Sequence, residues 1–359
     1  MGLQKKYIQG FASFLILGLI VIGLIIVTFP ILFNKKNNSA YQPILDKVSE
    51  IITTPTPTPF PFQEMTIPYL RKTEFESSLG ELNKVSENSN YTSYVGSYTS
   101  DGFKVYGLLT RPNQEMPEGG FPAIIFVHGY IPPQNYRTLV NYSSYIDYLA
   151  KNGFVVFKID LRGHGESEGE AGGGYYSGGY VIDTLNAYSA LQKSDFVNSK
   201  FIGLWGHSMA GNIVMRTFAA RPQIPAVVIW AGAGYTYTDL QEYRISDNSY
   251  QPPPEDSERT RKRQLLRETY GDFNPEHWFW KQVPATNYLS DLGGAVQINH
   301  AINDNVVSIE YSRNLNSLLD QTTLINELNE YSTGGHNISG SVFTQSMQNT
   351  VRFFKENMR

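Results

Sequence analysis

Short apolar runs alternate with amphipathic stretches through most of this 359-residue chain. Runs such as AIIFV, FVVFKI and AVVIW lack a polar face, as expected for strands covered by helices on both sides of a sheet. The predicted strands are Tyr94–Tyr98, Lys104–Leu109, Ala123–Val127, Phe154–Ile159, Phe201–Trp205, Ala226–Trp230, Ala295–Asn299 and Thr322–Glu327. The predicted helices are Tyr142–Ala150, Val181–Gln192, Met209–Ala220, Ile309–Leu319 and Val342–Asn357. This alternation predicts an α/β fold, with a mostly parallel central sheet of about eight strands and helices on both faces.

Residues 235–285 interrupt the alternation between two predicted strands. They contain a PPP turn, the charged segment EDSERTRKRQLLRE and the aromatic cluster HWFW at 277–280. An insertion of this length in a compact α/β domain is usually functional or helical. We therefore expect a small cap, with one solvated helix in the charged segment. The aromatic cluster is expected to form the packed core of the cap, and a sugar-stacking platform is the less favoured alternative.

Composition excludes several classes of function. The net charge is −4 and no Lys/Arg-rich block occurs, so nucleic-acid binding has no electrostatic footprint. The chain has no cysteine, which excludes disulfides, thiol catalysis, Cys-ligated zinc and iron–sulfur centres. Apolar residues make up 41% of the chain and charged residues 17%, which excludes general disorder.

The first 62 residues differ from the rest. No charged residue occurs in 11–33, and a helix of this length spans roughly 35 Å, enough to cross a hydrocarbon core of about 30 Å. We expect a short cytoplasmic tail at 1–10, a single transmembrane anchor at 11–33 and a linker at 34–62. The linker ends in TTPTPTPFPF, which favours a stiff, extended polyproline II spacer. Lysines flank both ends of the anchor, so the spacer decides the predicted orientation, with the folded domain (63–359) outside the cytoplasm at the cell membrane.

The sharpest local signal is GHSMAG at residues 206–211, directly after the predicted strand FIGLW and directly before a predicted helix. A nucleophile elbow needs this context, because a sharp turn between strand and helix presents the serine hydroxyl. The usual pattern is G-x-S-x-G, and here Ala210 occupies the last position. Similar strings occur by chance, but the placement at a strand–helix junction favours Ser208 as a nucleophile.

A serine hydroxyl needs a base, and the base needs an orienting acid. Asp304 follows one predicted strand, and His336 lies in the glycine-rich loop between the last strand and the last helix. Both therefore follow carboxyl ends of strands, where α/β active sites form. The chain order Ser208, Asp304, His336 singles out His336 among the six histidines.

The tetrahedral oxyanion of acyl transfer needs two donors aimed at one point. We expect the backbone N–H of Met209, directly after the serine, and that of Tyr130, in the loop after the third predicted strand. The loop Asp160–Ser167 lacks a second cluster of ligands, so no metal is expected there. No sign of a cofactor occurs in the sequence.

The motifs VHGY, DLRGHGES, GHSMAG, NHAINDNVV and GGHN, in this order, resemble those of the α/β-hydrolase fold. The set is more narrowly similar to the catalytic domain of the prolyl oligopeptidase family and its dienelactone-hydrolase-like relatives. The strand–turn–strand pattern around Asp101-Gly102 and the segment IPYLRK also resemble bacterial dipeptidyl-aminopeptidase-like members. The acid loop departs from the family pattern, with Ala301 in place of Gly and Ser308 in place of Pro.

This resemblance implies a serine hydrolase with the triad Ser208, Asp304 and His336 and an oxyanion hole formed by Tyr130 and Met209. Substrates would be small acyl esters or short peptides, cleaved by a peptidase or a carboxylesterase. The β-propeller of prolyl oligopeptidases has no counterpart here, which leaves peptidase and esterase equally open. The alternative is an inactive cell-surface binding or scaffold domain on the same fold. The sequence gives neither the natural substrate nor the oligomeric state.

Overall fold

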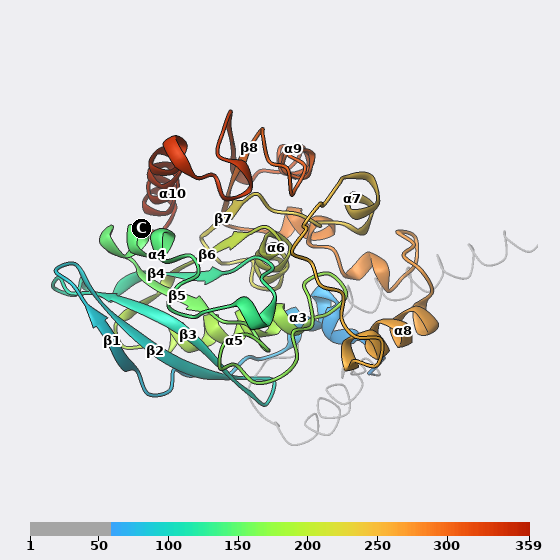
Figure 1. Ribbon diagram of the computed structural model, residues 1–359, viewed down its shortest axis with the longest axis horizontal. Helices are drawn as coiled ribbons and strands as arrows, with labels where there is room; N and C mark the ends of the chain where they lie inside the picture. The colour runs from blue at the N-terminus through green and yellow to red at the C-terminus, as the bar shows by residue number, and fades with distance from the viewer. Residues whose placement is uncertain (1–58) are drawn as a thin grey trace, which may run out of the picture. The chain divides into compact units, whose positions relative to one another are not determined.

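The computed structural model describes residues 59–359, which fold around one nine-stranded sheet (Figure 1). The strands are β1 Asn83–Glu87, β2 Tyr91–Ser100, β3 Phe103–Pro112, β4 Phe121–Val127, β5 Val155–Ile159, β6 Val197–His207, β7 Ala226–Trp230, β8 Ala295–Ala301 and β9 Ile325–Tyr331. Their order across the sheet is β1-β2-β3-β5-β4-β6-β7-β8-β9. From β5 to β9 every neighbouring pair is parallel, whereas β1, β2 and β3 form an antiparallel extension. The sheet is therefore mostly parallel, as predicted, with an antiparallel edge.

The β2–β3 hairpin is closed by Asp101 and Gly102, whose φ angles are 54° and 83°. Two consecutive residues with positive φ form the tight turn that Asp-Gly favours, because this turn matches the twist of the strands. The hairpin register is thereby fixed by local sequence.

Each predicted strand overlaps an observed one, but the sheet has nine strands and not about eight. The additional strand is β1, in which all five residues are exposed. It lacks the apolar pattern by which a strand is recognised. The start of β9 is also later than predicted, because Thr322 closes the preceding helix with a hydrogen bond from its hydroxyl to the Leu319 carbonyl, 2.7 Å.

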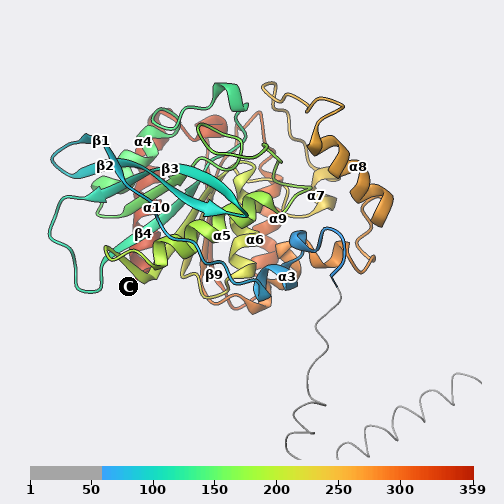
Figure 2. The same cartoon turned by 90° about the horizontal axis from the view of Figure 1, so that it is seen from below.

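Helices cover both faces of the sheet (Figures 1 and 2). On one face, α4 (Ser143–Lys151) and α10 (Phe343–Asn357) pack into an apolar cluster with β4, β6 and β7. On the other face lie α3 (Ile67–Lys72), α5 (Gly179–Gln192), α6 (Ala210–Ala220) and α9 (Glu310–Leu319). All eleven residues of α6 are buried. The helix that follows the elbow is therefore fixed on every side.

The cap contains α7 (Tyr237–Glu242), α8 (Glu258–Tyr270) and a 3₁₀ turn at Trp280–Gln282. The expected solvated helix is confirmed, since only Leu266 of α8 is buried. Phe279 and Trp280 are buried in a separate apolar cluster, as expected for a cap core, whereas Trp278 is 52% exposed.

The compact unit starts at Phe60, three residues before the predicted boundary at 63. Figure 2 shows this first segment beside the cap, and the ring of Phe60 lies 5.2 Å from that of Trp278, edge to face. The predicted anchor at 11–33 and nearly all of the linker at 34–62 fall outside the described residues. Within 59–359, no helix combines the length and the apolar character that a bilayer crossing requires.

Candidate active site

Ser208 occupies a sharp turn between β6 and α6. Its φ is 56°, in the left-handed region that residues other than glycine seldom adopt. The turn is held by two backbone hydrogen bonds, from Ser208 N–H to the Trp230 carbonyl (2.9 Å) and from Gly211 N–H to the Ser208 carbonyl (2.9 Å). This is the strand–turn–helix geometry that a nucleophile elbow requires.

Within the elbow (residues 206–211), positions 206 and 211 require glycine, whereas position 210 accepts alanine. A Cβ on Gly206 would lie 2.8 Å from the Ala210 carbonyl oxygen, and one on Gly211 would lie 2.8 Å from the Cα of Gly232. Both obstacles are backbone atoms, so neither can move aside cheaply. Close approach of the backbones is therefore needed at 206 and 211, whereas the side chain of Ala210 is accommodated in the core.

His336 and Asp304 are brought together by the loops that follow β9 and β8. The Nδ1 of His336 lies 2.8 Å from the Oδ2 of Asp304. Because the carboxylate only accepts, Nδ1 carries the proton and Nε2 of His336 is left with its lone pair. The loop around His336 is tightly turned, with φ values of 120° at Gly334 and 59° at Gly335.

The side chain of Asp304 is fully buried, and several hydrogen-bond donors contact its carboxylate. Its Oδ1 accepts the N–H groups of Val306 (2.7 Å) and Val307 (3.0 Å), and its Oδ2 is shared by His300 (3.1 Å) and His336. Burial alone would raise the pKa of this carboxyl, but the hydrogen bonds outweigh burial and hold the pKa of Asp304 below its ordinary value. The acid is therefore an anion at neutral pH.

His300 is a functional residue that the sequence reasoning missed. Its Nε2 faces Asp304 Oδ2 and the Val307 carbonyl (3.2 Å), both acceptors, while Nδ1 lies 2.7 Å from the hydroxyl of Ser312. Nε2 of His300 therefore donates to these acceptors, and Nδ1 pairs with the Ser312 hydroxyl. His300 lies near the end of β8 and Asp304 lies in the loop that follows, so their i, i+4 spacing is the signal that could have indicated it.

The elbow and the His336 loop are in contact through His207. The rings of His207 and His336 are 4.6 Å apart, and His207 Nε2 lies 2.9 Å from the carbonyl oxygen of His336. Within residues 59–359, no hydrogen bond joins the Ser208 hydroxyl to His336. Such bonds are often long without a ligand and tighten in the substrate complex.

Of the two expected oxyanion donors, Met209 belongs to the elbow and Tyr130 lies in the loop after β4. Met209 precedes the first residue of α6, and neither its N–H nor that of Tyr130 donates to another described residue. A Cβ on Gly129 would lie 3.1 Å from the carbonyl oxygen of His207, so the loop that carries Tyr130 packs directly on the elbow. The phenol oxygen of Tyr130 accepts the N–H of Gln251 (2.9 Å), which ties this loop to the cap.

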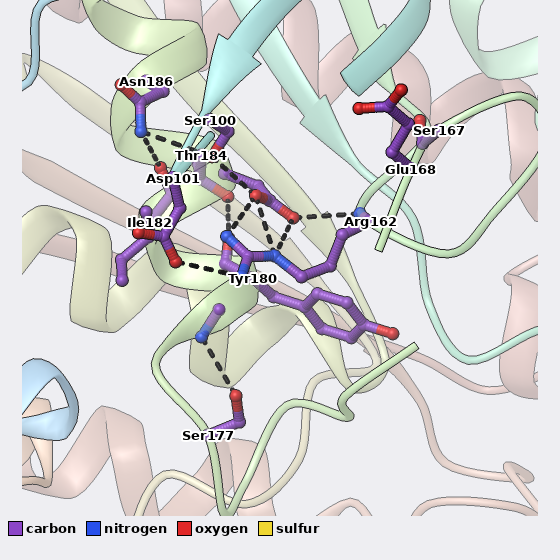
Figure 3. A network of polar contacts seen from close by, with 12 residues as sticks. Ser100, Asp101, Arg162, Ser167, Glu168, Ser177, Tyr180, Ile182, Thr184 and Asn186 are labelled. Carbon is purple, nitrogen blue, oxygen red and sulfur yellow. Dashed lines mark hydrogen bonds and ion pairs between the residues drawn. The ribbon is translucent and has the colours of Figure 1, made fainter. Parts of the chain in front are cut away.

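The loop Asp160–Ser167 has a structural role. Figure 3 shows the Arg162 guanidinium within a network of polar contacts. Arg162 donates to the carboxylate of Asp183 on α5 at 2.7 and 3.1 Å. Asp160 accepts the hydroxyls of Tyr136 and Thr138, both at 2.6 Å. Among the described residues, no group of three or more His, Cys, Asp or Glu could hold a metal ion.

A cavity of about 180 Å³ opens between this loop, α5 and α8. Its lining includes Arg162, Tyr176 and Arg259, but not Ser208, Asp304 or His336. The cavity is therefore separate from the elbow.

The fold is that of the α/β hydrolases. The solved structure of acetyl xylan esterase 1 from Thermoanaerobacterium superposes with a TM-score of 0.54 at 19% identity, covering 80% of this chain and 90% of that one. Residues 122–245 match the family model described as serine aminopeptidase, S33.

Two curated relatives match part of the chain. Human dipeptidyl peptidase 8 is 30% identical over 146 residues, 38% of this chain and 16% of that protein. An uncharacterised 31.7 kDa protein of Escherichia coli is 29% identical over 115 residues, 32% of this chain and 38% of that protein. The chain thus spans well under half of the curated relatives that it matches. These similarities support the α/β-hydrolase fold, and the similar proteins include both esterases and peptidases.

Proposed function

We propose that this protein hydrolyses an ester or amide bond through Ser208, His336 and Asp304. The observation that carries the proposal is the strained backbone of Ser208 at the β6–α6 junction, beside a His336–Asp304 pair in the tautomer of a general base. Strain of this kind persists at functional sites because the surrounding structure holds it in place.

In the proposed reaction, His336 Nε2 takes the proton of the Ser208 hydroxyl as Oγ attacks the carbonyl carbon of the substrate. The N–H groups of Met209 and Tyr130 stabilise the oxyanion, and Asp304 stabilises the imidazolium. The proton then passes from Nε2 to the leaving alcohol or amine, which leaves an acyl group on Ser208. Water, deprotonated by His336, attacks this acyl-enzyme and releases the acid.

Covalent labelling tests the proposal directly. A fluorophosphonate probe should label the wild-type chain at Ser208, and Ser208→Ala should abolish both labelling and turnover of p-nitrophenyl acyl esters. Ser86→Ala, which removes an exposed serine of β1, is the control and should label as the wild type does. A wild-type chain that resists the probe and has no esterase activity would support the inactive binding or scaffold domain instead.

The choice between esterase and peptidase rests on the relatives, since one matching protein is an acetyl xylan esterase and another a dipeptidyl peptidase. The cap contacts the loop of Tyr130, because the Gln251 N–H donates to the Tyr130 hydroxyl. Comparing kcat/KM for p-nitrophenyl acyl esters with that for dipeptidyl p-nitroanilides on the full chain separates the two.

We further propose that residues 11–33 anchor the enzyme in the cell membrane with its folded domain outside the cytoplasm. The proposal rests on the apolar run and on the proline-rich stretch that follows it. The chain should stay with membranes after alkaline extraction, and protease added to intact cells should digest the domain. Release into the soluble fraction would refute the anchor.

A further inference from the structure

A chain of hydrogen bonds joins three loops of the proposed active site. The Gly129 N–H lies 3.0 Å from the hydroxyl of Tyr142, and that hydroxyl lies 2.8 Å from Nδ1 of His207. At the other side of the ring, His207 Nε2 lies 2.9 Å from the His336 carbonyl oxygen. The chain thus runs from the loop before Tyr130, past the residue next to Ser208, to the backbone of the proposed base.

The direction of each bond follows from the groups at its ends. The His336 carbonyl can only accept, so Nε2 of His207 carries the ring proton, and Nδ1 of the neutral ring accepts. Tyr142 must then donate its hydroxyl proton to Nδ1, and its oxygen accepts the Gly129 N–H. Every donor and acceptor is used once. Removal of the Tyr142 hydroxyl would therefore leave the Gly129 N–H and the Nδ1 of His207 without a partner.

The same chain of hydrogen bonds fixes the peptide between Gly129 and Tyr130, which carries the expected oxyanion donor. The C=O of Gly129 and the N–H of Tyr130 belong to one planar trans peptide and point in opposite directions. That carbonyl oxygen lies 2.7 Å from Nδ1 of His128, and the N–H of the same glycine is held by Tyr142. With both sides of Gly129 bonded, the Tyr130 N–H can point in only one direction.

Tyr142 is itself held in an unusual conformation. Its φ of 63° and ψ of 18° are left-handed, directly before the first residue of α4. Its ring lies edge to face against Phe126 at 5.3 Å, and 5.6 Å from the ring of His207. Tyrosine seldom adopts this backbone conformation. We therefore infer that the surrounding structure holds the Tyr142 hydroxyl in place.

We propose that Tyr142 and His207 are positioning residues that set the Tyr130 N–H, the elbow and the His336 loop in one geometry before substrate binds. The inference rests on the proposed function of Ser208. Neither side chain is required to touch the substrate, so its effect should appear in transition-state stabilisation and not in substrate binding.

Tyr142→Phe tests the inference, because it removes only the hydroxyl. We expect kcat for a p-nitrophenyl ester to fall about 10- to 100-fold with little change in KM. The Ki of a phenylboronic acid, whose tetrahedral adduct with Ser208 occupies the oxyanion hole, should rise by a similar factor. The matched control is Tyr98→Phe in β2. It removes another buried hydroxyl, which donates to the Asp183 carbonyl at 3.0 Å. This variant should leave both kcat and the boronate Ki unchanged.

A double-mutant cycle separates positioning from general loss of stability. His207→Leu removes both the acceptor for Tyr142 and the donor for the His336 carbonyl, so the double variant should be no slower than the slower single variant. Gly129→Ala, whose added methyl would lie 3.0 Å from the Tyr142 hydroxyl, probes the same link if Tyr142→Phe does not fold. Equal boronate Ki values for Tyr142→Phe and Tyr98→Phe, or fully independent effects in the cycle, would overturn the inference. A wild-type chain that no fluorophosphonate labels would instead overturn the proposed function.

Discussion

At the scale of single residues, the proposed acid is held more strongly than a triad alone requires. Asp304 Oδ2 is shared by two imidazoles, and His300, which is fully buried, is fixed in turn by Ser312. His300 therefore orients the acid and lowers its pKa without reaching the substrate. A second imidazole on the acid also keeps the carboxylate in place while His336 changes charge during the reaction.

We expect His300→Leu to reduce kcat about 10-fold, because Asp304 loses a donor and becomes freer to rotate. His300→Gln, which can still donate from its amide nitrogen, should restore part of the rate. Burst kinetics with p-nitrophenyl acetate measure the rates of both variants. Equal rates for the two variants would show that the loss reflects packing and not the hydrogen bond.

Burial and the nearby His336 lower the pKa of His207 to about 3, from an ordinary value of 6.5. The unfolded chain therefore binds more protons than the folded chain between about pH 3 and 6.5, so stability falls as the pH is lowered through this range. Between pH 7 and 5 the loss from this one group is about 2 kcal/mol. Urea unfolding of the wild type and of His207→Gln at both pH values measures it, and the variant should lose about 2 kcal/mol less.

At the scale of elements, the sequence predicts best what is buried. The central strands and all five predicted helices were found because their apolar runs and periodicity reflect burial on the sheet. The exposed strand β1 carries no such pattern, and Thr322 ended a helix where a strand was expected. In the candidate site, motif spacing indicated Ser208, Asp304 and His336, but the contacts of Tyr142 and His207 depend on how distant segments pack and could not be read from spacing.

The contact between α6 and the loop after β7 should be intolerant of a single added methyl group. Gly211→Ala would place Cβ 2.8 Å from the Gly232 Cα, and we expect a loss of about 1–3 kcal/mol of unfolding free energy from overpacking. Gly172→Ala is the control, since its nearest neighbour would lie at an ordinary 3.4 Å. Urea denaturation of both variants gives the comparison, and a Gly211→Ala variant as stable as the control would contradict this account of the elbow.

At the scale of the whole described unit, the cap contacts both the loop of Asp304 and the loop of Tyr130. Ser246 donates its N–H to the Val306 carbonyl (2.7 Å) in the acid loop, and Gln251 bonds to Tyr130. On the opposite side, the Tyr270 hydroxyl donates to the Pro61 carbonyl (2.6 Å), so the first segment of the unit is part of the cap core. Loosening that segment should therefore disturb the cap.

The double substitution Phe60→Ala and Phe62→Ala tests this connection. We expect faster amide hydrogen exchange in α8, because the rings of Trp278 and Tyr270 lose their aromatic partners, with no change in β7. Val85→Ala, on the exposed strand β1, should alter neither element. Uniform acceleration across α8 and β7 would mean that the segment supports the entire fold.

The segment beginning at Phe60 is where any preceding chain joins the domain, and it enters at the cap and not at the sheet. A pulling force applied through that junction would therefore load the aromatic contacts of Phe60 and Phe62 first. The hydrogen-bonded ladders of the parallel strands would be loaded later than these aromatic contacts. Traction on this domain would in that case open the cap before it unravelled the sheet.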